Sequence, residues 1–213
     1  MHTTLTMRLT SSLGLALALG LAFATTASAQ SRTFRIRNDG GSRIQFISDA
    51  PLETITGVSS HVTGTVNVDP SDLSTARATV AVRVASIRTG VDLRDEHLRS
   101  PNWLDARRNP NATFEITRVE GASSLRPNQS TRVRLRGRFS LHGVTRNVVA
   151  NARVRLIPVT AEMRANHIDG DVIRAQASFR VRLTDYNISV PLPVRLKVAN
   201  EIRVNVTIRA IAE

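Results

Sequence analysis

The chain contains no cysteine and very few aromatic residues. Its 213 residues include one tryptophan, one tyrosine and six phenylalanines, 4% aromatic in total. Without cysteine the fold cannot depend on disulfide bridges, and a cysteine-based zinc site or a thiol nucleophile is excluded. The scarcity of aromatics argues against a barrel embedded in an outer membrane, because such barrels carry aromatic girdles at both interfaces.

Lysine is also nearly absent, since Lys197 is the only one. Arginine therefore supplies almost all of the 29 basic residues, which outnumber the 17 acidic residues and give a net charge of +12. The apolar fraction of 41% and the charged fraction of 22% are typical of a globular chain and not of a disordered basic tail.

Residues 1–29 predict a signal peptide. Arg8 forms a short positive region, residues 13–23 form an apolar run, and Ala27, Ser28 and Ala29 offer the small residues that a signal peptidase reads. The run is too short to span a bilayer as a helix. Cleavage near Ala29 and Gln30 would leave residues 30–213 as one exported domain, periplasmic or secreted. There, nucleic acid is not an expected partner, whereas anionic lipid head groups are plentiful.

A two-residue period dominates the rest of the chain. Apolar and basic residues alternate in 131–139, 152–156, 179–183 and 202–209, as in antiparallel strands with one buried and one wet face. Shorter strands are expected at 33–38, 43–48, 61–68 and 112–119, and a loop at 157–171. No amphipathic helices separate the long strands. We therefore predict an all-β fold, an antiparallel lipocalin-like β-barrel of about eight strands.

The register of one hairpin follows from its turn. If His142 and Gly143 form a two-residue turn, the numbers of paired residues on the two strands sum to 285. Apolar residues then gather on one face of the hairpin and polar residues on the other, almost throughout. A slip by one residue would invert every face, so we predict this register.

A short helical segment is predicted where the alternation stops. Residues 92–100 and 101–106 predict one or two short helices that cover an opening of the barrel. Asp95, Glu96 and His97 carry metal-binding and acid–base groups, but consecutive helical residues point about 100° apart and cannot converge on one ion. Acidic side chains that stabilise a helix start are the preferred interpretation. No Gly-x-Ser-x-Gly or His-Glu-x-x-His motif occurs, and we predict no catalytic residue, metal site or cofactor.

Seven short segments, in order, resemble the YceI-like family. They are residues 62–70, 85–90, 94–100, 103–106, 110–114, 141–146 and 185–188. Members of that family are exported lipocalin-like barrels associated with the binding of polyisoprenoids and other lipids. The resemblance implies that the barrel holds an elongated apolar lipid, isoprenoid or similar, for sequestration or carriage across the periplasm, with no bond made or broken.

The candidate ligand-contact residues are aromatic side chains expected on the barrel lining or its lid. They are Phe34, Phe46, Trp103, Phe114, Phe139 and Phe179. The same residues are equally expected in a solid core, so the sequence leaves both interpretations open. Apolar walls alone can supply affinity, at roughly 25 cal/mol per Å² of buried surface.

The outward-facing arginines of the strands also have two interpretations. They form either a solvated face or a surface that contacts an anionic membrane, where each basic residue contributes about 1 kcal/mol. Accordingly, the alternative to lipid carriage is a stress-related periplasmic protein that interacts with the envelope through its basic face. A third alternative, an outer-membrane barrel, would place the arginines in a narrow lumen with few carboxylates. The oligomeric state is left open.

Overall fold

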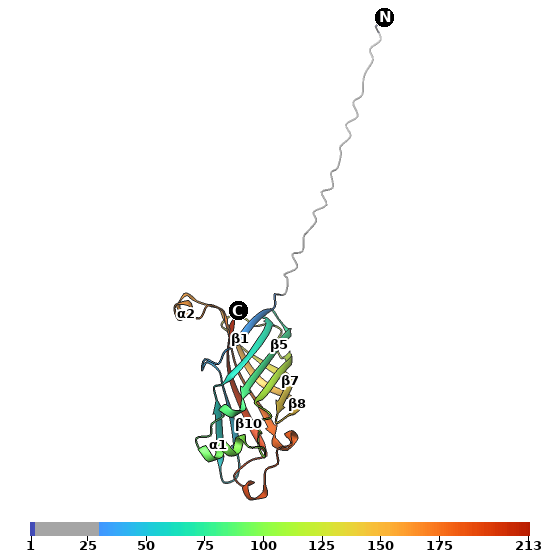
Figure 1. The fold of residues 1–213 in the computed structure, drawn as a ribbon. Helices are drawn as coiled ribbons and strands as arrows, with labels where there is room; N and C mark the ends of the chain where they lie inside the picture. Colours follow the sequence, from blue (N-terminus) through green and yellow to red (C-terminus); the bar gives the residue numbers. More distant parts are fainter. Residues whose placement is uncertain (3–29) are drawn as a thin grey trace.

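The computed structural model describes residues 1–2 and 30–213. The predicted signal peptide falls almost wholly on residues 3–29, outside the described residues. From residue 30 onward, strands wrap around a single interior, with short helices at the ends (Figure 1). The strands are β1 (Arg32–Ile36), β2 (Arg43–Asp49), β3 (Thr54–Ser59), β4 (Val62–Asp69), β5 (Asp72–Arg83), β6 (Asn111–Glu120), β7 (Ser130–Leu141), β8 (Val144–Ile157), β9 (Val172–Arg182) and β10 (Glu201–Ala212). The helices are η1 (Val84–Ser86), α1 (Asp92–Arg99), α2 (Ala161–Ala165), η2 (Leu183–Tyr186) and η3 (Leu192–Val194).

Eight strands close into an antiparallel ring, as predicted. Pairing passes from β1 to β4 and then in chain order from β5 to β10, and β10 pairs back to β1. The same edge of β10 also pairs with β2: Ala210 lies opposite Ile36 and Thr207 opposite Arg43. The β2–β3 hairpin therefore lengthens the wall on one side. The sequence did not predict β3.

The β7–β8 hairpin has the predicted register. Its pairs run from Ser130 opposite Arg155 to Leu141 opposite Val144, and each pair sums to 285. His142 and Gly143 have φ angles of 51° and 74°, the left-handed conformation that a two-residue turn of this kind requires. The turn thus fixes which face of both long strands points into the barrel.

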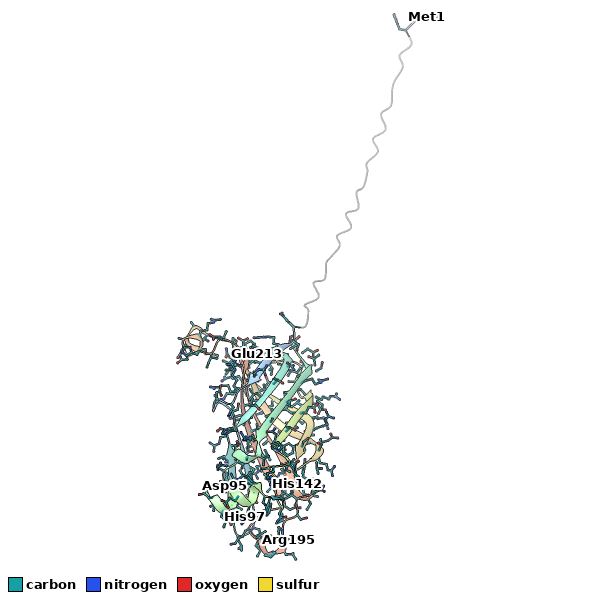
Figure 2. All side chains as sticks on the ribbon, viewed as in Figure 1. Met1, Asp95, His97, His142, Arg195 and Glu213 are labelled. Carbon is teal, nitrogen blue, oxygen red and sulfur yellow. The ribbon has the colours of Figure 1, made fainter. Side chains whose placement is uncertain are left out.

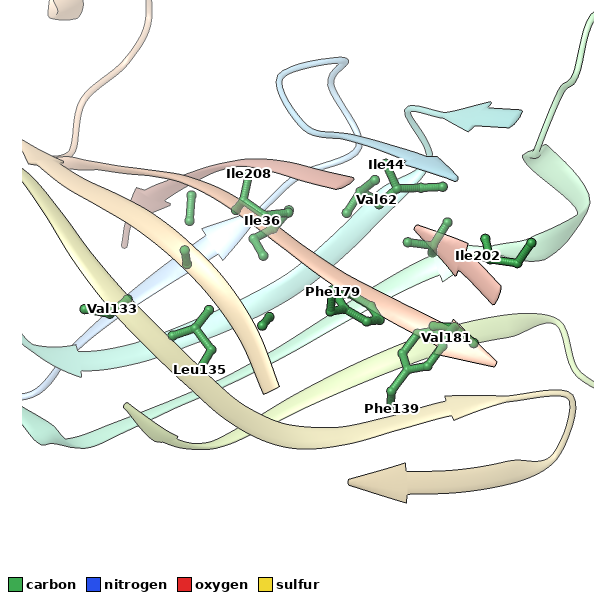
Figure 3. Close-up of a cluster of buried hydrophobic side chains, with 14 of the residues drawn as sticks. Ile36, Ile44, Val62, Val133, Leu135, Phe139, Phe179, Val181, Ile202 and Ile208 are labelled. Atoms are coloured by element: carbon green, nitrogen blue, oxygen red, sulfur yellow. The ribbon is translucent and has the colours of Figure 1, made fainter. Parts of the chain in front are cut away.

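Apolar side chains at alternate strand positions fill the interior. Figure 3 shows Leu135, Phe139, Phe179 and Val181 pointing into one cluster from β7 and β9, and all four are buried. The intervening arginines of the same strands are exposed. The two-residue period therefore separates an apolar lining from a basic outer wall.

Between β5 and β6, α1 forms at the predicted place, whereas residues 101–108 form turns and no second helix. Asp95 on α1 is buried and accepts hydrogen bonds from the backbone N–H and Oγ1 of Thr89, both at 2.7 Å. This carboxylate fastens the helix to the loop that precedes it. Among the described residues, no helix is long and apolar enough to cross a membrane.

The segment 157–171, expected to be a loop, contains the short helix α2. The Thr160 hydroxyl accepts a hydrogen bond from the backbone N–H of Met163 and so caps this helix. The prediction of a loop was wrong for residues 161–165, because Pro158 and Gly170 lie at the two ends of the segment and leave its middle free to form a turn of helix.

Candidate ligand-binding cavity

The barrel encloses a cavity of about 510 Å³. Its lining comes from the strands of the ring, from the β2–β3 hairpin and from α1, and consists mainly of valine, isoleucine, leucine, alanine and phenylalanine. Sites for small molecules typically measure about 300–1,000 Å³ and are lined chiefly by apolar groups. The interior is therefore not a solid core and has room for an apolar guest.

Five of the six candidate aromatic residues line this cavity: Phe46, Trp103, Phe114, Phe139 and Phe179. The Phe114 and Phe179 rings stack with centroids 5.6 Å apart, and Phe139 meets Phe179 edge to face at 5.2 Å. The contacts join β6, β7 and β9 across the interior. An aromatic wall thus forms on one side of the cavity, held by aromatic contacts as well as by burial.

Phe34 lies elsewhere. It is fully buried in the packed core, outside the cavity lining, and the guanidinium of Arg32 lies 5.3 Å from the centroid of its ring. Phe34 pairs with Val66 on β4 and Ala212 on β10, at the point where the ring of strands closes. Its position fits a packing role at the barrel seam.

Two glycines make room for the rings, a feature that was not predicted from the sequence. A Cβ atom on Gly57 would lie 2.1 Å from the Phe46 ring, and one on Gly137 would lie 2.7 Å from the Phe114 ring. Gly57 of β3 lies directly opposite Phe46 of β2, and Gly137 of β7 lies beside Phe114 of β6. Glycine inside a strand often marks such a close approach, so these two glycines are the sequence signal that could have indicated it.

The mouth of the cavity is at the α1 end of the barrel. Four exposed side chains of the cavity lining lie there, Val91, Leu93 and His97 from α1 and its approach and Lys197 from the loop before β10, whereas the exposed lining residue Arg77 lies within β5. Arg94 of α1 donates to Glu53 after β2 at 2.6 Å, which ties two sides of the mouth together. Figure 2 shows His97 and Arg195 at this end.

The opposite end is covered by buried leucines. Leu73 at the start of β5 and Leu125 from the loop between β6 and β7 both line the cavity. The backbone N–H of Leu125 donates to the Pro70 carbonyl at 2.7 Å, and that of Leu73 donates to the Ser123 carbonyl at 2.8 Å. The sequence did not identify Leu125 as a lining residue, because it lies in an irregular loop with no period.

Two polar side chains near the cavity, Tyr186 and His142, contribute to the packing of the barrel. Burial, reinforced by the neighbouring Asp185, raises the pKa of the Tyr186 phenol, which is therefore neutral at ordinary pH. The Tyr186 ring packs edge to face on Phe139 at 5.7 Å, and its carbonyl contacts Nδ1 of His142 at 3.0 Å. Within residues 1–2 and 30–213, no group of three His, Asp or Glu side chains is placed to hold a metal ion.

A closed antiparallel barrel around an apolar cavity defines the class of a ligand-binding barrel. The chain belongs to the YceI-like family, whose domain matches residues 35–210. One relative, "Protein YceI" from Salmonella newport strain SL254, is 27% identical over 173 residues, which cover 79% of this chain and 82% of that protein.

Solved structures share the fold. BcnA from Burkholderia cenocepacia superposes with a TM-score of 0.64 at 16% identity, covering 82% of this chain and 98% of that one. A polyisoprenoid binding domain from Saccharophagus degradans, implicated in plant cell wall breakdown, gives a TM-score of 0.63 at 15% identity, covering 86% and 100%. The predicted family and fold are confirmed.

Proposed function

We propose that this protein holds one elongated apolar lipid, a polyisoprenoid or a similar chain, inside the barrel. The observation that carries the proposal is the apolar cavity of about 510 Å³, with its aromatic wall of Phe114, Phe139 and Phe179. Each 100 Å² of lipid chain buried there contributes about 2.5 kcal/mol, at roughly 25 cal/mol per Å². The lining supplies this term without any diagnostic polar group.

The family membership and the polyisoprenoid binding domain among the structural neighbours support a binding role. We infer that the protein makes and breaks no bond, so that its action is sequestration or carriage of the lipid. With residues 1–29 as a signal peptide, carriage takes place across the periplasm or outside the cell. The residues that we expect to contact the lipid are Phe46, Trp103, Phe114, Phe139 and Phe179, whereas Phe34 packs in the core at the barrel seam and does not contact the lipid.

A cavity-filling variant tests the proposal. Ala175 lines the cavity from β9, and its neighbour Gln176 is exposed on the outer wall. Ala175→Phe should reduce the uptake of a long polyprenol by about tenfold or more while leaving the melting temperature nearly unchanged. In a solid core the same substitution would cost about 1–3 kcal/mol of stability.

The readout is the amount of polyprenol that co-elutes with the protein in gel filtration, beside a thermal melt. Gln176→Phe is the matched control and should bind like the wild type. The proposal fails if the wild type takes up no polyprenol. Unchanged uptake by Ala175→Phe would place the lipid outside the cavity.

A second candidate function is contact with an anionic membrane through the basic outer wall. Arginines lie directly opposite one another there, Arg132 with Arg153 and Arg155 with Arg174. Like charges in direct cross-strand pairs are destabilising, so an anion laid across them would relieve the repulsion. This second candidate, unlike contact through any other surface, requires salt-dependent binding to anionic vesicles that is lost in an Arg132→Gln, Arg153→Gln double variant.

A further inference from the structure

Exposed large apolar side chains gather at the mouth of the cavity. Leu192 is 74% exposed, Leu52 is 68% exposed and Leu196 is 56% exposed, and Val91 and Leu93 of the α1 region are also exposed. The backbone N–H of Leu52 donates to the Leu196 carbonyl at 2.8 Å, so the turn after β2 and the loop before β10 are adjacent. Within residues 30–213, Val149 on the outer wall is the exposed large apolar side chain that lies away from this end.

The loop 191–198 combines these leucines with positive charge. Its sequence alternates apolar residues with Arg195 and Lys197 and contains no carboxylate. Val194, Lys197 and Val198 line the cavity, while Leu192, Arg195 and Leu196 point into solvent. The Nε of Arg195 donates to the Val190 carbonyl at 3.2 Å, which holds its side chain against the loop. We call Leu52 and residues 191–198 the mouth tip.

We infer that the mouth tip inserts into the head-group region of an anionic lipid bilayer and sets the cavity mouth against the membrane. This inference rests on the proposed function, because the bilayer would be the source or destination of the lipid. Segments that carry leucine beside lysine and arginine are typical of interfacial membrane contact. A lipid that passes directly between bilayer and cavity also keeps its chain out of water.

Two alternatives fit less well: a second copy of the chain as the occupant of the tip, and the arginine wall as the surface that meets the membrane. A second copy of the chain, docked tip to tip about a two-fold axis, would bring the same loop of both copies together and oppose Arg195 and Lys197 with their own counterparts. The arginine wall offers charge to a membrane but exposes only Val149 as a large apolar anchor. The tip joins apolar anchors, basic charge without a carboxylate, and access to the cavity.

Vesicle co-sedimentation tests the inference, with vesicles of phosphatidylethanolamine and phosphatidylglycerol at low and high salt. Replacing Leu52, Leu192 and Leu196 together by serine should weaken binding by about tenfold for each leucine. Arg195→Gln should weaken binding by about fivefold at low salt and by less at high salt. None of these four residues lines the cavity, so uptake of polyprenol from cyclodextrin should be unchanged.

Val149→Ser and the double variant Arg132→Gln, Arg153→Gln are the matched controls on the outer wall and should bind vesicles like the wild type. Loss of binding in the wall double variant, with full binding by the triple serine variant, would overturn the inference in favour of the wall. A wild-type dimer in analytical ultracentrifugation that the serine substitutions dissociate would assign the tip to self-association. If the wild type takes up polyprenol from cyclodextrin but binds no vesicles, only this inference fails. If it takes up no polyprenol, the proposed function fails.

Discussion

At the scale of single residues, Glu120 shows how the protein manages its excess of arginine. The carboxylate accepts a hydrogen bond from Nε of Arg136 at 2.6 Å and lies within 4 Å of Arg134 and Arg118 on the outer wall. The hydrogen bond from Arg136, together with the three positive charges, holds the pKa of Glu120 below its usual value of 4.5. One carboxylate thus offsets repulsion among three arginines.

The Glu120→Gln substitution should make the stability of the folded protein less dependent on pH in the acidic range. Because the pKa of Glu120 is lower in the folded than in the unfolded protein, its stabilising effect is complete above the unfolded value and is lost as the pH falls through the folded value. The melting temperature of Glu120→Gln should therefore lie below that of the wild type at pH 7, and the two should converge in strong acid. Thermal melts of both proteins from pH 7 to strong acid measure this difference in melting temperature.

Glu162→Gln on α2 is the control for that series, since Glu162 makes no ion pair in the described part of the chain. Its melting temperature should follow the wild-type curve. A constant difference between Glu120→Gln and the wild type, from neutral pH into strong acid, would contradict the assigned role of the Glu120 charge.

At the scale of elements, the β7–β8 turn determines how the long strands β7 and β8 align with each other. His142 holds a left-handed φ of 51° and contacts the Tyr186 carbonyl through Nδ1 at 3.0 Å. Histidine tolerates this conformation, as does asparagine, whereas a β-branched residue is strained there. The turn residue therefore couples local conformation to the packing of η2 against the barrel.

His142→Val should be less stable than His142→Asn by about 1–2 kcal/mol, the cost of left-handed backbone for an ordinary side chain. Both variants lose the contact of the imidazole with Tyr186, so the difference between them isolates the backbone term. Urea denaturation of both proteins measures it. Equal stabilities would show that the turn does not constrain this position.

The elements also show where sequence prediction succeeded. Strict alternation identified the long strands and the register of β7 with β8, because a buried face on one side leaves only one acceptable pairing. β3 was not predicted as a strand because Gly57 interrupts its apolar pattern. Glycine is needed at this position because the Phe46 ring of the neighbouring strand leaves no room for a Cβ atom. Residues 101–106 are not helical because Ser100, which precedes Pro101, has an extended ψ of 162° that ends α1, and Asp105 then takes a positive φ of 43°.

At the scale of the whole molecule, closure of the ring produces the cavity. Apolar residues at alternate positions of every strand are compatible with a barrel packed solid by side chains and with a barrel that encloses a cavity. Only the assembled barrel distinguishes these two structures. Leu125 and Lys197 could not be predicted as lining residues, since both lie in irregular loops that have no period to indicate which side chains face the interior. The orientation of the wall was predictable: apolar rows face inward and arginine rows outward, the reverse of a barrel that faces lipid.

The central claim is that the barrel carries an elongated apolar lipid, and native mass spectrometry of protein purified from its own host tests it most directly. The expected result is a bound mass of one lipid per chain, identified as polyprenyl or similar after extraction and absent from Ala175→Phe. A barrel repeatedly recovered empty from its host, which also takes up no added polyprenyl lipid, would contradict the account.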